Sequence, residues 1–155
     1  MSTILEKSKI VNIICSIVIE NDNKYLLVKE AKEAVKGLWN FPSGKVEFNE
    51  DLISAIKREA LEETGYKCDI TDLMSIYYFY WDDMIGLTVR FNFWGKLNNI
   101  KKNPLADDII ESDWFTLEEI EKLAKENKLR HKTTCKQLND LKENLRYPLS
   151  IIKAP

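Results

Sequence analysis

The segment IVNIICSIVIE, at residues 10–20, constrains the fold more than any other stretch of the chain. It is filled with the β-branched residues isoleucine and valine, which is typical of a buried strand. The segment is too short to span a bilayer, and no small-residue cleavage site follows it. We therefore expect a core strand of a cytoplasmic protein that does not contact a membrane. The turn residues NDN and the run KYLLVKE at 24–30 extend this strand into a predicted hairpin.

The pattern becomes helical after residue 48, beyond an extended stretch at 37–48. Asn49 is predicted to be the N-cap of this helix, because a short polar side chain can accept a hydrogen bond from the first turn. Glu50 and Asp51 then lie in that turn, where the helix dipole favours negative charge. Gly65 marks the predicted C-terminal end, since glycine readily adopts the left-handed conformation found there.

Strands dominate the middle of the chain after this helix. They are predicted at 72–81 and 87–97, joined by the turn DDMIG, and at 109–115, after a polar loop. Thr116 and Glu119 have the spacing of a capping box, so a helix should follow them. A last helical stripe consists of Cys135, Leu138, Leu141 and Leu145. The order β-β-β-α-β-β-β-α-α predicts an α/β fold with a mixed sheet, in one domain over residues 1–155.

The charge balance limits the partners of the protein. The chain of 155 residues has 23 basic and 25 acidic residues, for a net charge of −2. This balance gives no overall basic field that would attract nucleic acid, so we expect no nucleic-acid partner. A polyanionic substrate would need local positive charge, which a bound metal ion supplies most economically. We expect a monomer or a homodimer.

The cysteines and the histidine exclude several common catalytic centres. Cys15, Cys68 and Cys135 are odd in number, far apart and without a CxxC pair, so we expect free thiols rather than a disulfide framework or a zinc site. His131 is the only histidine and lies among basic residues. We interpret it as a surface or capping residue, which argues against Ser-His-Asp and Cys-His catalysis.

Glutamates on the predicted helix lie where apolar residues should be. With Leu52 at 0° on a helical wheel, Ile56 falls near 40° and Ala60 near 80°, and these define the inward face. Glu63 falls at roughly 20° and Glu59 at roughly 340°, within or beside this face. A solvated acidic helix would instead present its glutamates opposite the apolar stripe.

Inward carboxylates are costly unless their charge is neutralised, because burial and mutual repulsion both disfavour the ionised form. A divalent cation removes this cost, and oxygen ligands suit Mg²⁺ or Mn²⁺. The alternatives are pairing with Lys57 and Arg58, or exposure on a frayed last turn. Glu62, at roughly 280° on the wheel, lies four residues after Arg58, which can orient it.

The segment GKVEFNEDLISAIKREALEETGY, from Gly44 to Tyr66, resembles a complete Nudix box. The pattern of this box is G-x5-E-x7-R-E-U-x-E-E-x-G-U, where U is an apolar residue. Ala60 and Tyr66 fill the two apolar positions, the tyrosine less typically. Every fixed position is matched, namely by Gly44, Glu50, Arg58, Glu59, Glu62, Glu63 and Gly65.

Membership of the Nudix family would imply an α/β/α sandwich and a hydrolase of phosphoanhydride bonds. By this resemblance, Mg²⁺ is held by the carboxylates of Glu59, Glu62 and Glu63 and the backbone carbonyl of Gly44. Glu50 and Arg58 would brace the loop and the helix, and both count with Glu59 among the predicted catalytic residues. A water molecule would attack phosphorus in line with the leaving group.

Flanking motifs are similar to those of the NudJ-like phosphatases, which act on nucleoside di- and triphosphates and on hydroxymethylpyrimidine and thiamine pyrophosphates. These motifs are LWNFPSGKVE, RFNF, DDIIESDWFTLEEI and LRYPL. A small non-glycine residue, Ser43, follows Pro42, as in this subgroup. The chain has no proline between Gly65 and Pro104, which argues against ADP-ribose pyrophosphatase activity.

Residues outside the box are predicted to contact the substrate or the attacking water. Asp108 is the candidate general base, because the subgroup has an acidic residue at this position. Asp107 and Glu111 are alternatives to it, and a solvated acidic loop is the competing explanation. The expected metabolite is small and phosphorylated, and a phosphate contact is predicted for Arg90 on the polar face of its strand, with an ordinary surface arginine as the alternative.

The aromatic residues allow two interpretations. They can stack on a base or pyrimidine ring of the substrate, or they can fill the core, which we expect of most of them. Substrate contacts are predicted for Trp39 and Phe41, and the run at 77–81 is a further possibility.

Two other functions remain open from the sequence. One is the hydrolysis of dinucleoside polyphosphates or of other nucleoside-diphosphate compounds. The other is a non-catalytic Nudix module that senses a nucleotide, which the complete set of box glutamates argues against, since a sensor does not need them all.

Overall fold

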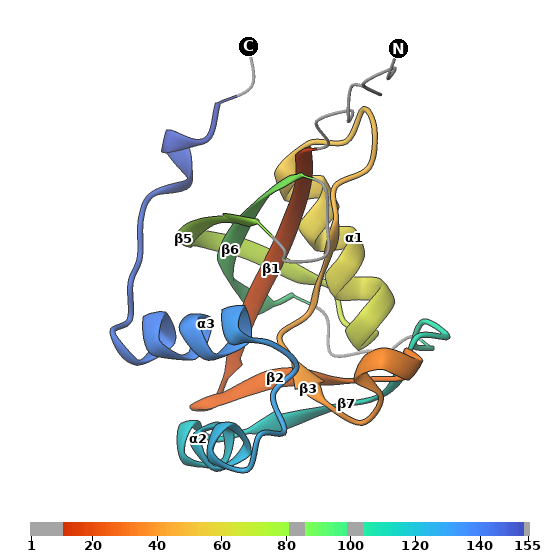
Figure 1. The fold of residues 1–155 in the computed structure, drawn as a ribbon. Coiled ribbons are helices and arrows are strands. Elements are labelled where there is room, and N and C mark those ends of the chain that lie inside the picture. The colour runs from red at the N-terminus through yellow and green to blue at the C-terminus, as the bar shows by residue number, and fades with distance from the viewer. Residues whose placement is uncertain (1–10, 81–85, 99–103, 154–155) are drawn as a thin grey trace, which may run out of the picture.

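A seven-stranded mixed sheet forms the centre of the molecule (Figure 1). This computed structural model describes residues 11–80, 86–98 and 104–153. The main path of the sheet runs β3-β2-β1-β6-β5, while β4 pairs with β1 and β7 with β2. β1 and β6 are parallel, and the other strand pairs are antiparallel. The strands are β1 Val11–Asn21, β2 Lys24–Glu30, β3 Trp39–Asn40, β4 Ser43–Lys45, β5 Cys68–Tyr80, β6 Leu87–Leu97 and β7 Ile109–Phe115.

Helices pack on both faces of this sheet. α1 (Leu52–Thr64) lies on one side of β1, and α3 (Lys132–Lys142) lies on the other (Figure 1). α2 (Leu117–Lys125) packs near α3 and β7. Two short 3₁₀-helices, η1 (Glu33–Val35) and η2 (Leu149–Ile151), complete the structure. The predicted α/β/α sandwich with a mixed sheet is confirmed.

Each face of the sheet has its own hydrophobic core. Between the sheet and α1, side chains such as Ile17, Ile56 and Phe93 are fully buried. On the opposite face, Met74 and Phe41 pack with residues of the two C-terminal helices, including Ile120 of α2. Alternation along β1 explains this arrangement, because successive side chains of a strand point to opposite faces. β1 is therefore the buried strand that the composition of this segment predicts.

The start of α1 differs from the prediction. Asp51 is the N-cap, and its carboxylate accepts a hydrogen bond from the backbone N–H of Ser54, at 2.9 Å. Asn49, the predicted N-cap, has a φ of +61° and precedes the helix. Its left-handed backbone brings the chain from the β4 side into the helix, so Glu50 and Asp51 lie before the first turn rather than within it. Gly65 ends the helix at φ +76°, as predicted.

The capping residues of the C-terminal helices are confirmed. Thr116 and Glu119 form the complete capping box of α2, and His131 caps α3 by accepting a hydrogen bond from the Thr133 N–H. The predicted stripe on α3 is wrong at its two ends. Cys135 is exposed, and Leu145 lies beyond the last residue of the helix.

The hairpin of β5 and β6 begins earlier than predicted. β5 starts at Cys68 rather than at residue 72, and register shifts on either side of Leu73 let the longer strand stay paired with β6. Trp81, most of the predicted turn at 82–86 and part of the predicted loop before β7 lie outside the described residues.

The sheet face toward α3 contains a row of polar side chains. Ser43, Ser16, Asn92 and Ser75 are direct neighbours across β4, β1, β6 and β5. One step along the strands, Lys45, Ile14, Arg90 and Tyr77 form the next row. Residues that are directly opposite in a sheet share a face. The predicted polar face of β6 is therefore real, but it is covered by α3 instead of water.

The late motif LRYPL packs against β5 and β6 of the sheet. The guanidinium of Arg146 lies 3.9 Å from the centre of the Trp94 ring and pairs with Asp72 at 3.2 Å. Backbone hydrogen bonds join Tyr147 to Leu73 in both directions. These contacts give the motif a structural role. None of the helices among the described residues combines the length and the apolar character that crossing a membrane requires.

Candidate active site

The glutamates of α1 have the orientation that the helical wheel predicts. Glu63 is only 6% exposed, and the side chain of Glu59 is 13% exposed. The side chain of Glu62, at the edge of the apolar stripe, is 50% exposed. Two carboxylates therefore face the sheet, and the third lies at the boundary with solvent.

Arg58 is surrounded by carboxylates. Its guanidinium donates to Glu50 and Glu59 at 2.7 Å and to Glu62 at 3.3 Å. It also donates to the backbone carbonyl of Lys45 in β4, at 3.1 Å. These contacts join the helix to the strand and the intervening loop, as predicted for a bracing arginine. The hydrogen bond from Arg58 also lowers the pKa of Glu50, so that this carboxylate stays ionised.

The short strand β4 lies directly against the two inward carboxylates. A Cβ atom at Gly44 would lie 2.1–2.4 Å from the carboxylate atoms of Glu59, so any other residue here would force this carboxylate to move. The backbone N–H of Ser43 donates to Glu63 at 2.9 Å. Gly44 is thus required by the close approach of a backbone to a carboxylate.

Burial raises the pKa of Glu59 and raises that of Glu63 well above its ordinary value. Desolvation is the main cause in both, and it outweighs the hydrogen bonds to Arg58 and to the Ser43 N–H. A divalent cation would remove this penalty. In the parts of the chain that the structure describes, no three His, Cys, Asp or Glu side chains converge on one point. The fit to a metal ion rests on the buried carboxylate of Glu63, the mostly buried carboxylate of Glu59 and the Gly44 backbone beside Glu59.

A small cavity of about 250 Å³ opens next to Gly44. The described residues of its wall include four basic side chains and no acidic one. The basic residues are Lys32, Lys45, Arg90 and Arg130, and the N-terminal end of α3 contributes His131, Thr133 and Thr134. Backbone N–H groups at a helix N-terminus favour anions, so every charged element of this wall favours an anionic ligand.

Arg90 is 6% exposed, which overturns the alternative of an ordinary surface arginine. It lines the small cavity, and its guanidinium donates to the amide oxygens of Asn92 at 3.0 Å and Gln137 at 3.1 Å. Burial lowers the pKa of Arg90 to about 10, so it remains protonated at neutral pH. Arg130 has a different environment, because it pairs at 2.5 Å with Glu30, a carboxylate that is 1% exposed.

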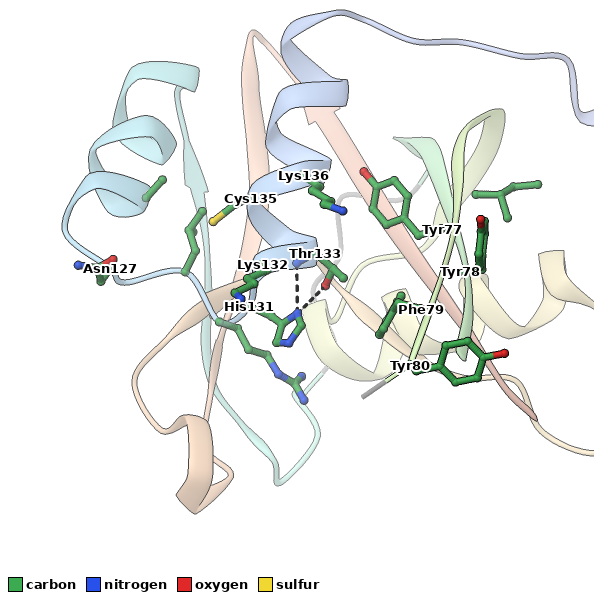
Figure 2. A pocket seen from close by; sticks show the side chains of 14 residues that line it. Tyr77, Tyr78, Phe79, Tyr80, Asn127, His131, Lys132, Thr133, Cys135 and Lys136 are labelled. Carbon is green, nitrogen blue, oxygen red and sulfur yellow. Dashed lines mark hydrogen bonds between the residues drawn. The ribbon is translucent and has the colours of Figure 1, made fainter. Parts of the chain in front are cut away.

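A larger cavity of about 830 Å³ adjoins the small one and shares Arg130, His131 and Thr133 with it. One wall is the aromatic end of β5, and the opposite wall is α3 with the segment before it. Figure 2 shows Tyr77 and Phe79 directed toward α3, with Tyr78 and Tyr80 on the other side of the strand. The basic residues of the wall formed by α3 and the segment before it are Arg130, Lys132 and Lys136.

The predicted substrate contacts of Trp39 and Phe41 are corrected by burial. Phe41 has no exposed surface, and Trp39 is 9% exposed and packs edge-on against Phe115 at 4.7 Å between ring centres. Both rings belong to the core beneath α2 and α3. The aromatic side chains that line a cavity come instead from β5, within the run at 77–81 that was the further candidate from the sequence.

The three candidate bases occupy different environments. Asp108 is partly exposed and pairs with Lys32 at 3.1 Å, and its negative charge contributes to the raised pKa of Glu59 and Glu63. Asp107 is exposed. Glu111 lies on β7 and pairs with Lys29 at 3.0 Å, away from the small cavity. Only Asp108 has electrostatic coupling to the glutamates of α1 and a direct partner in the cavity wall.

Several residues of the cavities were not predicted from the sequence. They are Lys32, Lys45, Arg130 and the N-terminal residues of α3. Nothing local distinguishes these basic residues from surface ones, since the tertiary fold alone brings them together. The sequence predicted His131 to be a surface or capping residue, and not a part of a cavity wall.

Comparisons with known proteins agree with the box. The sequence profile of the NUDIX domain matches residues 11–137. Over 136 residues, the chain is 31% identical to phosphatase NudJ of Shigella boydii, and the match covers 87% of this chain and 86% of that protein. The chain is also 45% identical over 56 residues to putative nudix hydrolase 1 of Caenorhabditis elegans, but this match spans only 15% of that protein and 36% of this one.

The fold is also shared with a solved structure. A NUDIX hydrolase from Nitrosomonas europaea superposes with a TM-score of 0.83 at 32% sequence identity. The similarity covers 94% of this chain and 98% of that one. The domain profile, the relative similar over most of its length and the fold lead to one conclusion, that the chain belongs to the Nudix family.

Proposed function

We propose that the protein hydrolyses a phosphoanhydride bond of a nucleoside di- or triphosphate in a reaction that depends on Mg²⁺. One observation carries this proposal. The inward glutamates of α1 lie against β4, Glu59 beside Gly44 and Glu63 beside the Ser43 N–H, and Gly44 also lines a cavity with basic walls that adjoins a larger, partly aromatic one. The site thus offers three kinds of group in sequence from α1 to the larger cavity. Carboxylates can bind a cation, basic groups can bind phosphates, and aromatic groups can contact a ring.

Glu59 and Glu63, with Glu62 and the carbonyl of Gly44, would hold the metal ion. A metal ion bound there would neutralise phosphate charge and lower the pKa of its bound water. Arg58 keeps Glu59 and Glu62 near each other through its two hydrogen bonds. The proposed task of the protein side chains is to orient the ligands and the phosphates before reaction, which is the main source of catalysis in phosphoryl transfer.

Arg90 would bind a phosphate oxygen in the small cavity, where Lys32, Lys45 and Arg130 add positive charge. Asp108 is the proposed base that accepts a proton from the attacking water. Its loop is fixed to the end of α1 by the hydrogen bond from the Ala106 N–H to the Glu62 carbonyl, at 2.8 Å. This attachment would keep the Asp108 carboxylate close to the glutamates throughout the reaction.

The larger cavity supports a nucleoside as the organic part of the substrate. Its volume of about 830 Å³ lies within the range of small-molecule sites, about 300–1,000 Å³. Tyr77 and Phe79 offer ring faces, and Arg130 lies where the two cavities meet. A hydroxymethylpyrimidine or thiamine pyrophosphate is the second candidate, supported by the flanking motifs that resemble those of the NudJ-like phosphatases. The hydroxymethylpyrimidine ring is smaller than a nucleoside and would fill less of this space.

The test is a substrate panel with Mg²⁺ and the full chain. It should include nucleoside di- and triphosphates, thiamine pyrophosphate, a dinucleoside polyphosphate and ADP-ribose. Products distinguish the possibilities, and we expect release of orthophosphate. Reaction in H₂¹⁸O then identifies which phosphorus atom gains the label.

Glu63→Gln should abolish most turnover in this panel, while Glu121→Gln on α2 should leave turnover unchanged. Unchanged turnover in Glu63→Gln would refute the metal mechanism. Tight nucleotide binding without turnover in the unmodified protein would instead support the sensor alternative.

A further inference from the structure

Arg90 is a buried cation with no carboxylate in hydrogen-bond or ion-pair contact among the described residues, and Glu63 acts on it only at longer range. Its two hydrogen bonds go to the neutral amides of Asn92 and Gln137. Burying an unpaired charge is unfavourable, and a carboxylate at either position would compensate it. A residue that served only to join α3 to the sheet would be better stabilised by such an ion pair.

The amide of Gln137 is fixed by what it contacts. Its Oε1 atom accepts from Ser16 Oγ at 3.0 Å and from Arg90 Nη2 at 3.1 Å. Arginine can only donate, so the oxygen must face it. Among the residues that the structure describes, the Nε2 atom of Gln137 consequently has no hydrogen-bond partner, although this side chain has no exposed surface. A glutamate would avoid this unsatisfied donor, yet the chain has glutamine here.

Asn92 continues the polar row away from the cavity. Its Nδ2 atom donates to Ser75 Oγ at 3.0 Å, and Ser75 in turn donates to Asp140 of α3 at 2.6 Å. Tyr77 donates to the same carboxylate. The acidic group of this network is thus occupied by two hydroxyl groups and separated from Arg90 by Asn92 and Ser75.

Arg130 provides the contrast within the same cavity wall. Its charge is compensated by the buried Glu30, which also accepts a hydrogen bond from Asn40 at 3.4 Å. One arginine of the cavity is therefore paired inside the protein, and the other is left with its charge available. The difference lies in the partner side chains, a carboxylate for Arg130 and amides for Arg90.

We infer that Asn92 and Gln137 are positioning residues that hold Arg90 at the small cavity without neutralising it, so that a substrate phosphate is the anion that it pairs with. This inference rests on the proposed function, because it assigns the phosphate contact of the same site. The two amides fix the direction of the guanidinium and leave its charge uncompensated. A carboxylate at either position would compete with the phosphate.

The test replaces an amide by the carboxylate of the same shape, in Asn92→Asp and, separately, in Gln137→Glu. Binding of inorganic pyrophosphate to the full chain is measured by calorimetry, with and without Mg²⁺. We expect about tenfold weaker binding in each variant. With a nucleotide substrate, KM should rise by a similar factor while kcat changes little. The melting temperature should stay the same or rise, because a buried cation gains a partner.

Asn98→Asp is the matched control, since it adds the same charge on an exposed side chain beyond the end of β6. It should bind pyrophosphate as the unmodified protein does. Unchanged affinity in folded Asn92→Asp and Gln137→Glu, with a higher melting temperature, would overturn the inference and leave Arg90 a structural residue. The calorimetry needs no turnover. Failure of the proposed function would therefore show in the substrate panel, and failure of this inference in pyrophosphate binding.

Discussion

Arg58 and Arg90 are both largely withdrawn from water, but their surroundings are opposite. Arg58 lies among the carboxylates of Glu50, Glu59 and Glu62. Its single positive charge neutralises only part of their negative charge. Arg90 lies among amides and further basic groups in the wall of the small cavity. The acidic region has more negative charge than its arginine can compensate, and the cavity has positive charge without an acidic group in its wall.

This difference shows what each region lacks. A bound cation would compensate the excess of carboxylates at α1, and a bound anion would compensate the excess of basic groups in the cavity. A complex of Mg²⁺ with a phosphorylated substrate would supply both at once. Changes that remove the excess charge on either side should therefore affect different observables, with metal dependence on one side and substrate affinity on the other.

The largest expected effect is on the acidic side. Glu59→Gln keeps the shape of the side chain but removes the charge that faces Gly44, so turnover should fall by at least about a hundredfold. Steady-state kinetics at saturating substrate would measure this. Glu121→Gln is the control, since that glutamate pairs with Lys142 on the surface between α2 and α3. Turnover in Glu59→Gln within a factor of two of the unmodified protein would contradict the assigned ligand.

Gly44→Ala tests the same region without changing any charge. The added Cβ would overlap the carboxylate of Glu59 and displace it. We expect the Mg²⁺ concentration for half-maximal activity to rise about 10- to 100-fold, the range seen when the support of a metal ligand is disturbed. A metal titration of activity measures it. An unchanged requirement for Mg²⁺, with normal folding by circular dichroism, would show that this contact does not position Glu59.

The acidic region was predictable because it is local in sequence. A single helix contains Arg58, Glu59 and Glu63, so their relative directions follow from the helical period alone. The loop that enters the helix was less predictable. Capping by Asp51 instead of Asn49 depends on how the chain arrives from β4, and the sequence of the first turn does not contain this information.

The basic cavity was not predictable in the same way. Lys32, Arg90 and Arg130 are distant in the chain and come together only because α3 covers the face of the sheet that contains the polar row. Alternation along β6 predicted a polar face that includes Arg90, but alternation does not say whether water or a helix covers that face. The same limit explains Trp39 and Phe41, whose burial depends on the packing of α2 and α3.

Stability provides a direct test of the contrast between the two arginines. Arg58→Met leaves three carboxylates without their shared cation, so the metal-free protein should lose about 1–3 kcal/mol of unfolding free energy. Arg90→Met removes an uncompensated buried charge, so its loss should be smaller, while KM should rise. Urea unfolding of both variants measures the difference. A larger loss for Arg90→Met would mean that Arg90 mainly supports the fold.

The smallest expected effect is a pH-dependent response to Mg²⁺. Because burial raises the pKa of Glu59 and Glu63, these groups favour the folded state at low pH, and this contribution is lost as the pH rises through their raised pKa values. Mg²⁺ binds the ionised forms and should restore stability there. At ten times its dissociation constant it would add about 1.4 kcal/mol, or roughly 3–5 °C in melting temperature.

The Mg²⁺-induced shift should therefore be larger at pH 8 than at pH 5. Glu50 and Asp51, whose pKa values are lowered by their hydrogen bonds, have the opposite pH dependence. Comparing samples with and without Mg²⁺ at each pH largely cancels their contribution, provided that ionic strength is matched with NaCl. Equal shifts at the two pH values would separate Mg²⁺ binding from the ionisation of Glu59 and Glu63. The carboxylates of Glu59 and Glu63 would then be stable in their protonated form, and the acidic region would not require a cation.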